Sequence, residues 1–79
     1  MIMNELSMLE LKNMVAHQLN LPVDEIQQED NLFMLGLDSV SLMTLVGLLR
    51  EKGFQIEFQD LVEEPTLNEW SDRLKLNRD

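Results

Sequence analysis

The serine at position 39 is the residue in this sequence best placed for the attachment of a chemical group. It follows Gly36 and Asp38 and stands at the predicted first turn of a helix, so its hydroxyl should point outward from the helix N-terminus. A phosphate ester there would be stabilised by free backbone N–H groups and by the positive end of the helix dipole. Because serine often begins helices, this interpretation depends on the residues around Ser39.

Other kinds of chemistry find little support in the residue types. A serine nucleophile needs a general base and an oxyanion site, but the single histidine, His17, falls in the middle of a predicted helix. No glycine follows Ser39 where a nucleophile elbow would need one. The acidic residues between positions 24 and 30 lack the alternating spacing of a calcium loop, and the chain has no cysteine. We therefore expect neither a catalytic site nor a metal site.

The spacing of apolar residues predicts an all-α fold with three main helices and one short helix. The first main helix, over 7–19, begins with the capping-box pair Ser7 and Glu10. An earlier start near Asn4 is an alternative, since Ile2 and Leu6 continue the apolar pattern less cleanly. The second main helix is predicted over 39–52, because Asp38 is a favourable N-cap residue.

The C-terminal part of the chain is predicted to hold the two remaining helices. A short third helix is expected over 58–64, and a last helix over 66–76 begins with a second capping-box pair, Thr66 and Glu69. Residues 54–58 alternate like a strand, but one short strand would have no partner here. We interpret them as an extended link.

The connection between the first two main helices, residues 20–38, is long for so small a domain. A connection of this length is usually functional or held down by its own side chains. Pro22, Asp24 and Glu25 suggest a short helical turn within it. Its apolar residues are expected to pack on the helices, and they are Leu21, Val23, Ile26, Leu32, Phe33 and Leu35.

The second main helix carries apolar residues on two faces. One stripe, sufficient for a helix that packs on one side, consists of Leu42, Leu45, Val46 and Leu49. A different arc, extended by Thr44 and Leu48, contains Val40, Met43 and Gly47. Complete burial of this helix would explain both faces, but the chain has few helices to cover it. We interpret the second arc as an exposed apolar patch for partner proteins, beginning one residue after Ser39.

Length and charge limit the function classes. The chain has 79 residues, no cysteine and a formal net charge of −9, which disfavours nucleic acid and anionic membranes as partners. No basic leader is visible, and no segment approaches the roughly 20 apolar residues that a membrane span needs. We expect one soluble, cytoplasmic and monomeric domain over 1–79, ordered over about 7–76.

Two segments resemble one known family over nearly the whole chain. Residues 31–40 (NLFMLGLDSV) are similar to the phosphopantetheine attachment motif of acyl and peptidyl carrier proteins. Residues 58–67 (FQDLVEEPTL) are similar to the third-helix region of that family, at the matching distance. The run from Gly36 to Val40, followed by Leu42 and Met43, looks most like aryl carrier proteins of nonribosomal peptide and siderophore synthesis. It lacks the acidic second helix of fatty-acid carriers and the double-glycine lead of peptidyl carriers.

The resemblance implies a fold and a set of site residues. The fold is the four-helix carrier-protein bundle with a long first loop, and the cofactor is 4′-phosphopantetheine attached covalently to Ser39. Asp38 caps the helix and helps the transferase to recognise the site, and Leu37 lies beside the arm. The partner-facing positions are Val40, Met43, Gly47, Phe58 and Val62. Core packing is an equal alternative for Phe58, and Trp70 is expected in the core.

The resemblance also implies a carrier that serves other enzymes and is not itself an enzyme. A phosphopantetheinyl transferase would attach the arm, an adenylation enzyme would load an aryl acid as a thioester, and a condensation or tailoring enzyme would collect it. Two alternatives stay open. One is a general acyl carrier for polyketide, fatty-acid or D-alanyl transfer chemistry, and the other is an unmodified helical protein-interaction domain.

Overall fold

The computed structural model describes residues 6–76, which form helices, turns and one extended link around a single hydrophobic core. The helical elements in chain order are α1 (Met8–Leu19), the 3₁₀ turn η1 (Val23–Glu25), α2 (Ser39–Glu51), α3 (Phe58–Glu63) and α4 (Leu67–Leu74). Over these described residues the predicted all-α fold is confirmed, including the short turn after Pro22. The link over 54–57 is extended without pairing as a strand.

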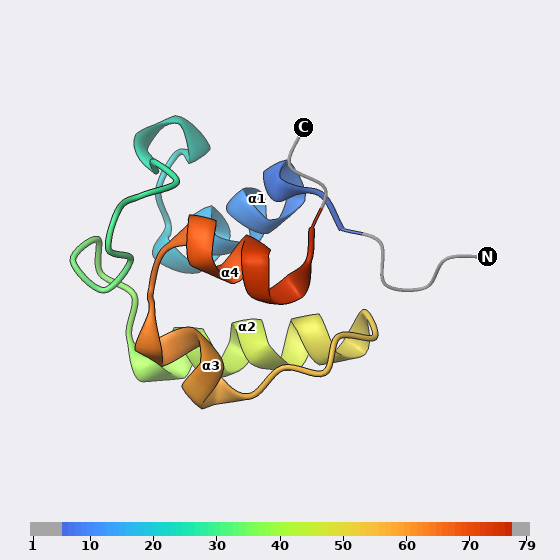
Figure 1. Ribbon diagram of the computed structural model, residues 1–79. Helices are drawn as coiled ribbons and strands as arrows, with labels where there is room; N and C mark the ends of the chain where they lie inside the picture. Colours follow the sequence, from blue (N-terminus) through green and yellow to red (C-terminus); the bar gives the residue numbers. More distant parts are fainter. Residues whose placement is uncertain (1–5, 77–79) are drawn as a thin grey trace.

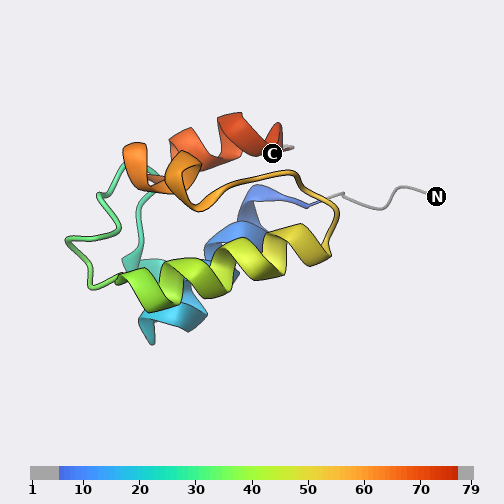
Figure 2. The same ribbon diagram turned by 90° about the horizontal axis from the view of Figure 1, so that it is seen from below.

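The helices form a small bundle in which α1 is central. It packs against both α2 and α4, while α3 packs against α2. Figures 1 and 2 show α3, in orange, close to the start of α4, and the long connection 20–38 along the end of the bundle where α2 begins. The connection thus leads along this end of the bundle to the first turn of α2.

Side-chain caps begin three of the helices where the sequence predicts them. At α1 the Ser7 hydroxyl accepts from the Glu10 N–H at 3.1 Å, and the Glu10 carboxylate accepts from the Ser7 N–H at 2.9 Å. At α2 an Asp38 oxygen accepts from the Ser41 N–H at 2.8 Å. At α4 the Thr66 hydroxyl accepts from the Glu69 N–H. Each bond satisfies an N–H group that has no partner inside its helix.

The predicted capping box of α4 is only half formed. The Thr66 hydroxyl accepts from the Glu69 N–H at 3.2 Å, but the Thr66 N–H donates to the Glu64 carbonyl at 2.9 Å. A side-chain hydrogen bond and charge repulsion, both from Glu64, raise the pKa of the Glu69 carboxyl. Glu69 therefore faces another carboxyl group instead of the start of its own helix.

Three helices end earlier than predicted. Helix α2 ends at Glu51, one residue before the expected end, with Lys52 as its C-cap. Helix α3 ends at Glu63, one residue before the expected end. Helix α4 ends at Leu74 instead of position 76, because Lys75 adopts the left-handed conformation with φ 58° and its N–H donates to carbonyls of the preceding turn. Such a residue terminates a helix as glycine usually does.

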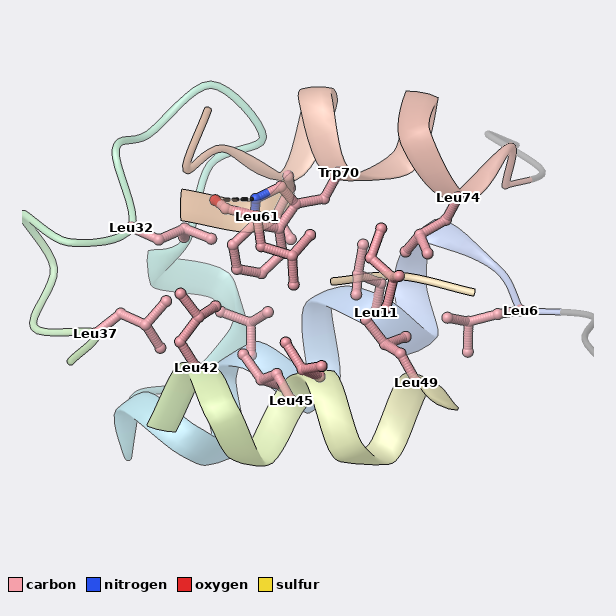
Figure 3. Close-up of a cluster of buried hydrophobic side chains, with 14 of the residues drawn as sticks. Leu6, Leu11, Leu32, Leu37, Leu42, Leu45, Leu49, Leu61, Trp70 and Leu74 are labelled. Carbon is pink, nitrogen blue, oxygen red and sulfur yellow. Dashed lines mark hydrogen bonds between the residues drawn. The ribbon is translucent and has the colours of Figure 1, made fainter. Parts of the chain in front are cut away.

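The core contains the predicted stripe of α2 together with residues from every other α-helix (Figure 3). Leu42, Leu45, Val46 and Leu49 are all buried, as expected. Trp70 is fully buried, and its indole Nε1 donates to the Leu61 carbonyl oxygen at 3.0 Å. This bond satisfies the polar atom of the largest core side chain and ties α4 to α3.

The long connection is pinned at several points. Ile26 and Leu32 are buried, and the Leu32 N–H donates to the Pro65 carbonyl at 2.8 Å. A second tie runs from the Asn68 N–H to the Gln28 carbonyl at 3.0 Å. Of the other apolar residues in the connection, Leu21, Val23 and Leu35 are half-buried.

Phe33 is the exception among the predicted loop anchors, because its side chain is exposed. The Asn31 carboxamide oxygen accepts from the Phe33 N–H at 2.9 Å and from the Met34 N–H at 3.3 Å, which winds residues 32–36 into successive turns. Within these turns Leu32 faces the core, so its neighbour Phe33 is turned outward. The prediction that Phe33 packs down on the helices is wrong.

Candidate functional site

Ser39 is the first residue of α2, and its side chain is exposed. The residue before it, Asp38, holds the helix start through its bond to the Ser41 N–H. That bond lowers the pKa of the Asp38 carboxyl, because a hydrogen bond from a backbone N–H favours the ionised form. A charged N-cap therefore fixes the first turn while the neighbouring hydroxyl remains open to solvent.

The chain reaches Ser39 through a tight turn that needs glycine. Gly36 has φ 114°, a conformation that L side chains rarely adopt, although a Cβ atom at this position would meet no atom within 4 Å. The turn closes where the Leu37 N–H donates to the Leu32 carbonyl at 3.1 Å. Backbone conformation, and not lack of space, is the reason for glycine at this position.

Leu37 anchors the segment that carries Ser39. Its side chain is only 4% exposed and points into the core beside Leu42 (Figure 3). The predicted place of Leu37 beside an attached arm stays a prediction, and its burial leaves little of the side chain for that contact. The buried leucine and the capped aspartate together hold Ser39 at a defined position on the surface.

The face of α2 that follows Ser39 is apolar and exposed. Val40 is 75% exposed and Met43 is 56% exposed, and Gly47, one turn further along, is exposed as well. Thr44 donates its hydroxyl to the Val40 carbonyl at 3.1 Å. Complete burial of α2 is therefore ruled out. The predicted exposure of the second arc is confirmed for Val40, Met43, Thr44 and Gly47, whereas Leu48 at its edge is half-buried. The use of this arc by partners stays a prediction.

Exposed apolar side chains also precede Ser39, and the sequence interpretation did not assign them to the site. Met34 is 83% exposed and Phe33 is 37% exposed, and both belong to the turn that leads to α2. The signal was available in the spacing, because the inward residues Leu32 and Leu35 are three apart and leave the two between them on the outside. We call Phe33, Met34, Val40 and Met43 the apolar surface around Ser39.

The two predicted partner positions on α3 are partly buried. Phe58 and Val62 both pack against the core cluster and both keep part of their surface exposed. They stand four residues apart and so share one face of α3. For Phe58 the two interpretations are compatible, since the residue packs against the core cluster and still keeps part of its surface accessible.

Two further properties of the described residues bear on function. Within 6–76, no group of three or more histidine, cysteine, aspartate or glutamate side chains is arranged to hold a metal ion. None of the helices in that range has the length and apolar character that crossing a bilayer requires.

Comparison with known proteins gives one family match and several similar sequences. A family model described as a phosphopantetheine attachment site matches residues 10–74. The chain is 36% identical over 87% of its length to phenyloxazoline synthase MbtB of Mycolicibacterium paratuberculosis, of which it covers 6%. It is 37% identical over 76% of its length to an isochorismatase of Bacillus subtilis, of which it covers 19%.

A third similar sequence is fungal. N-benzoylphenylalaninol synthetase apmA of Penicillium brevicompactum is 37% identical over 86% of the chain, which covers 3% of that protein. The chain thus spans less than a fifth of each of these relatives, and in each the similarity is confined to a segment the size of one small domain.

Proposed function

The chain belongs to the family of phosphopantetheine attachment domains, and on that premise we propose that the Ser39 hydroxyl is the atom that receives the arm. The family match confirms the resemblance in the sequence and, with it, a carrier role and 4′-phosphopantetheine as the cofactor. The observation that supports Ser39 is its position as an exposed first residue of α2, between a charged N-cap and an apolar surface.

The residues at this position fit a phosphodiester. The N-terminus of α2 places the positive end of the helix dipole beside the Ser39 hydroxyl, which favours a negative phosphate there. The carboxylate of Asp38 is engaged by the Ser41 N–H, so its charge is partly compensated before any phosphate arrives. No charged side chain lies within α2 before Arg50.

Attachment would transfer the phosphopantetheine half of coenzyme A to the serine. The Ser39 oxygen forms an ester bond to phosphorus while the pyrophosphate bond of coenzyme A breaks and its nucleotide half leaves. The serine proton passes to a base that the transferase supplies. When bound, the arm provides a terminal thiol that holds an acyl group as a thioester, and this chain supplies attachment and recognition.

We assign an aryl acid as the cargo. In support, the names of two relatives, a phenyloxazoline synthase and an N-benzoylphenylalaninol synthetase, denote products with aromatic acyl-derived groups. The partners on this proposal are a phosphopantetheinyl transferase, an adenylation enzyme and a condensation or tailoring enzyme. Since attachment consumes coenzyme A, we place the reaction in the cytoplasm.

The apolar surface around Ser39 suits partners that bind and leave. Its four exposed side chains are few beside the roughly 20–30 residues that each partner contributes to a stable interface. Affinity among related complexes is set mainly by the dissociation rate. A small apolar patch near the reactive group therefore allows each enzyme in turn to reach the arm and release it.

Intact-protein mass spectrometry tests the attachment site. Incubation with coenzyme A and a promiscuous transferase should add the mass of one phosphopantetheine to the wild type and none to Ser39→Ala. Ser41→Ala, two residues along the same helix, is the matched control and should be modified like the wild type. Modification of Ser39→Ala, or a folded wild type that gains no mass, would overturn the proposal.

A loading assay tests the cargo. The arm-bearing protein is offered to adenylation enzymes specific for aryl acids and to enzymes specific for aliphatic acids, and the bound acid is read by mass. We expect loading by the aryl enzymes. Loading by the aliphatic enzymes alone would favour the general acyl carrier instead.

A further inference from the structure

Helix α3 is too short to be stable through its own hydrogen bonds. It has six residues, whereas isolated helices in water are marginal below about 12 residues. It buries one residue completely, Leu61, whose carbonyl oxygen accepts from the Trp70 indole. Contacts with neighbouring elements therefore determine how α3 sits on the bundle.

Arg73 of α4 forms ion pairs with two carboxylates of α3. Its Nη1 atom lies 3.0 Å from Asp60 Oδ1, and its Nη2 atom lies 3.3 Å from Glu63 Oε1. The second oxygen of Asp60 accepts from the Glu57 N–H at 2.9 Å, at the start of α3. One guanidinium group thus engages a carboxylate within α3 and a second at its last residue, and the first of these, Asp60, also holds the helix start.

A second arginine fixes the link that leads into α3. The Nε atom of Arg50 donates to the Ile56 carbonyl at 2.9 Å, and its Nη2 atom lies 2.7 Å from Glu57 Oε1. This contact sets where α3 begins. Its partners are the N-cap residue Glu57 and the residue before it, which both precede the first residue of α3.

The Arg73 contacts lie on the opposite side of α3 from its predicted partner face. With about 100° between successive residues, the direction midway between Asp60 and Glu63 is about 150° from that midway between Phe58 and Val62. Leu61 lies on one flank. Besides buried Leu61, the Trp70 bond and the partial packing of Phe58 and Val62 hold α3 on the bundle. The Arg73 ion pairs add a contact on the side of α3 that faces away from Phe58 and Val62, where they oppose rotation of the helix about its axis.

We propose that Arg73 is a positioning residue, which sets the rotation of α3 and so presents Phe58 and Val62 beside the surface around Ser39. The inference rests on the proposed function, since it concerns how partners meet the arm-bearing domain. Arg73 itself lies on α4 and acts through Asp60 and Glu63. These ion pairs are partly exposed, and such pairs are individually weak. Because α3 is only marginally stable, even weak contacts can change how often it opens or shifts on the bundle.

Residue-resolved amide hydrogen exchange is the first test. Arg73→Gln should speed exchange of the α3 amides by about two- to five-fold, the range that corresponds to partly exposed ion pairs. The amides of α2 should keep their rates. Lys52→Gln is the control, because it removes the same charge from an exposed lysine that belongs to none of the ion pairs within residues 6–76. In this variant the α3 amides should exchange as in the wild type. Unchanged α3 exchange in Arg73→Gln, or equal acceleration in every helix, would overturn the proposal.

Enzyme kinetics provide the readout that a purely structural role would not change. With the arm attached, Arg73→Gln should raise the KM of the adenylation enzyme for this domain by about two- to five-fold and leave kcat unaltered. Arg73→Lys should recover part of the effect, because an ammonium group keeps the charge but cannot hold two carboxylates with one planar fork. An unchanged KM despite faster exchange in α3 would show that Arg73 only stabilises the fold.

A double-mutant cycle locates the effect. Asp60→Asn keeps an oxygen that can accept from the Glu57 N–H, so it removes the charge and spares the helix start. In the double variant, Asp60→Asn with Arg73→Gln, the α3 amides should exchange no faster than in the faster of the two single variants. Purely additive effects would count against an ion pair between Arg73 and Asp60 that holds α3. The mass gain at Ser39 is measured on the wild type and on every variant. If the wild type gains no mass, the proposed function is refuted. If modification is normal and α3 exchange is unaltered in Arg73→Gln, only the role of Arg73 is refuted.

Discussion

The indole of Trp70 and the main-chain carbonyl of Leu61 meet in the core at 3.0 Å, joining α4 to the short α3. Trp70→Phe keeps an aromatic ring but removes the donor, leaving a carbonyl in α3 without this buried partner. We expect a loss of about 1–3 kcal/mol in the free energy of unfolding, from the unpaired carbonyl and the smaller ring. Urea unfolding followed by circular dichroism measures it, since tryptophan fluorescence is lost. A loss below about 0.5 kcal/mol would mean that the bond has no net effect.

Gly36 and Gly47 should respond to alanine in opposite directions. A Cβ atom at either position would meet no other atom within 4 Å, but Gly36 has φ 114° and Gly47 lies inside α2. Gly47→Ala should stabilise the protein by about 0.5–1 kcal/mol, because alanine favours the helix. Gly36→Ala should destabilise it by about 1 kcal/mol or more through backbone strain. Thermal unfolding of both variants checks the signs, and a stabilising Gly36→Ala would contradict the requirement for glycine in the turn.

The N-cap at Asp38 should make stability depend on pH in the acid range. The pKa of its carboxyl is lowered from the usual 3.8, chiefly by the Ser41 N–H, so the folded state favours the ionised form. Its contribution is therefore fully present above the unfolded value and is lost as the pH falls through the lower folded value. Wild type and Asp38→Ala should differ in unfolding temperature at neutral pH and converge in strong acid. A difference that does not change on acidification would argue against capping by the ionised carboxylate.

Met43→Glu should separate the exposed face of α2 from its core face. Met43 is exposed, so helicity and unfolding temperature should be nearly unaltered, while a charge within the apolar surface around Ser39 should weaken partner binding. Using the usual effect of disrupting an interface residue, we expect KM for loading to rise by about 5- to 30-fold. Gln27→Glu adds the same charge to the exposed loop and serves as the control. Loss of helicity in Met43→Glu would instead assign Met43 to the core.

The sequence alone was sufficient for features that depend on neighbouring residues. Helix starts at Ser7 and Asp38 follow from side-chain bonds that span three residues, and the buried stripe of α2 follows from helical spacing. The place of Ser39 on the first turn of α2 is local in the same sense. The attachment motif is a continuous segment as well, so its resemblance to carrier proteins could be seen before the fold was known.

Only the tertiary structure decided features that depend on residues distant in the chain. Met34 is exposed and Leu37 is buried because the bonds of Leu32, one of them to the distant Pro65, orient the turn before Ser39. The contact between Arg73 and Asp60 spans thirteen residues and two helices, and no periodicity predicts it. Local spacing was thus enough to place Ser39 at the start of α2. Folding alone brings together the elements that form the surface around that serine. It also brings Arg73 to the two carboxylates of α3.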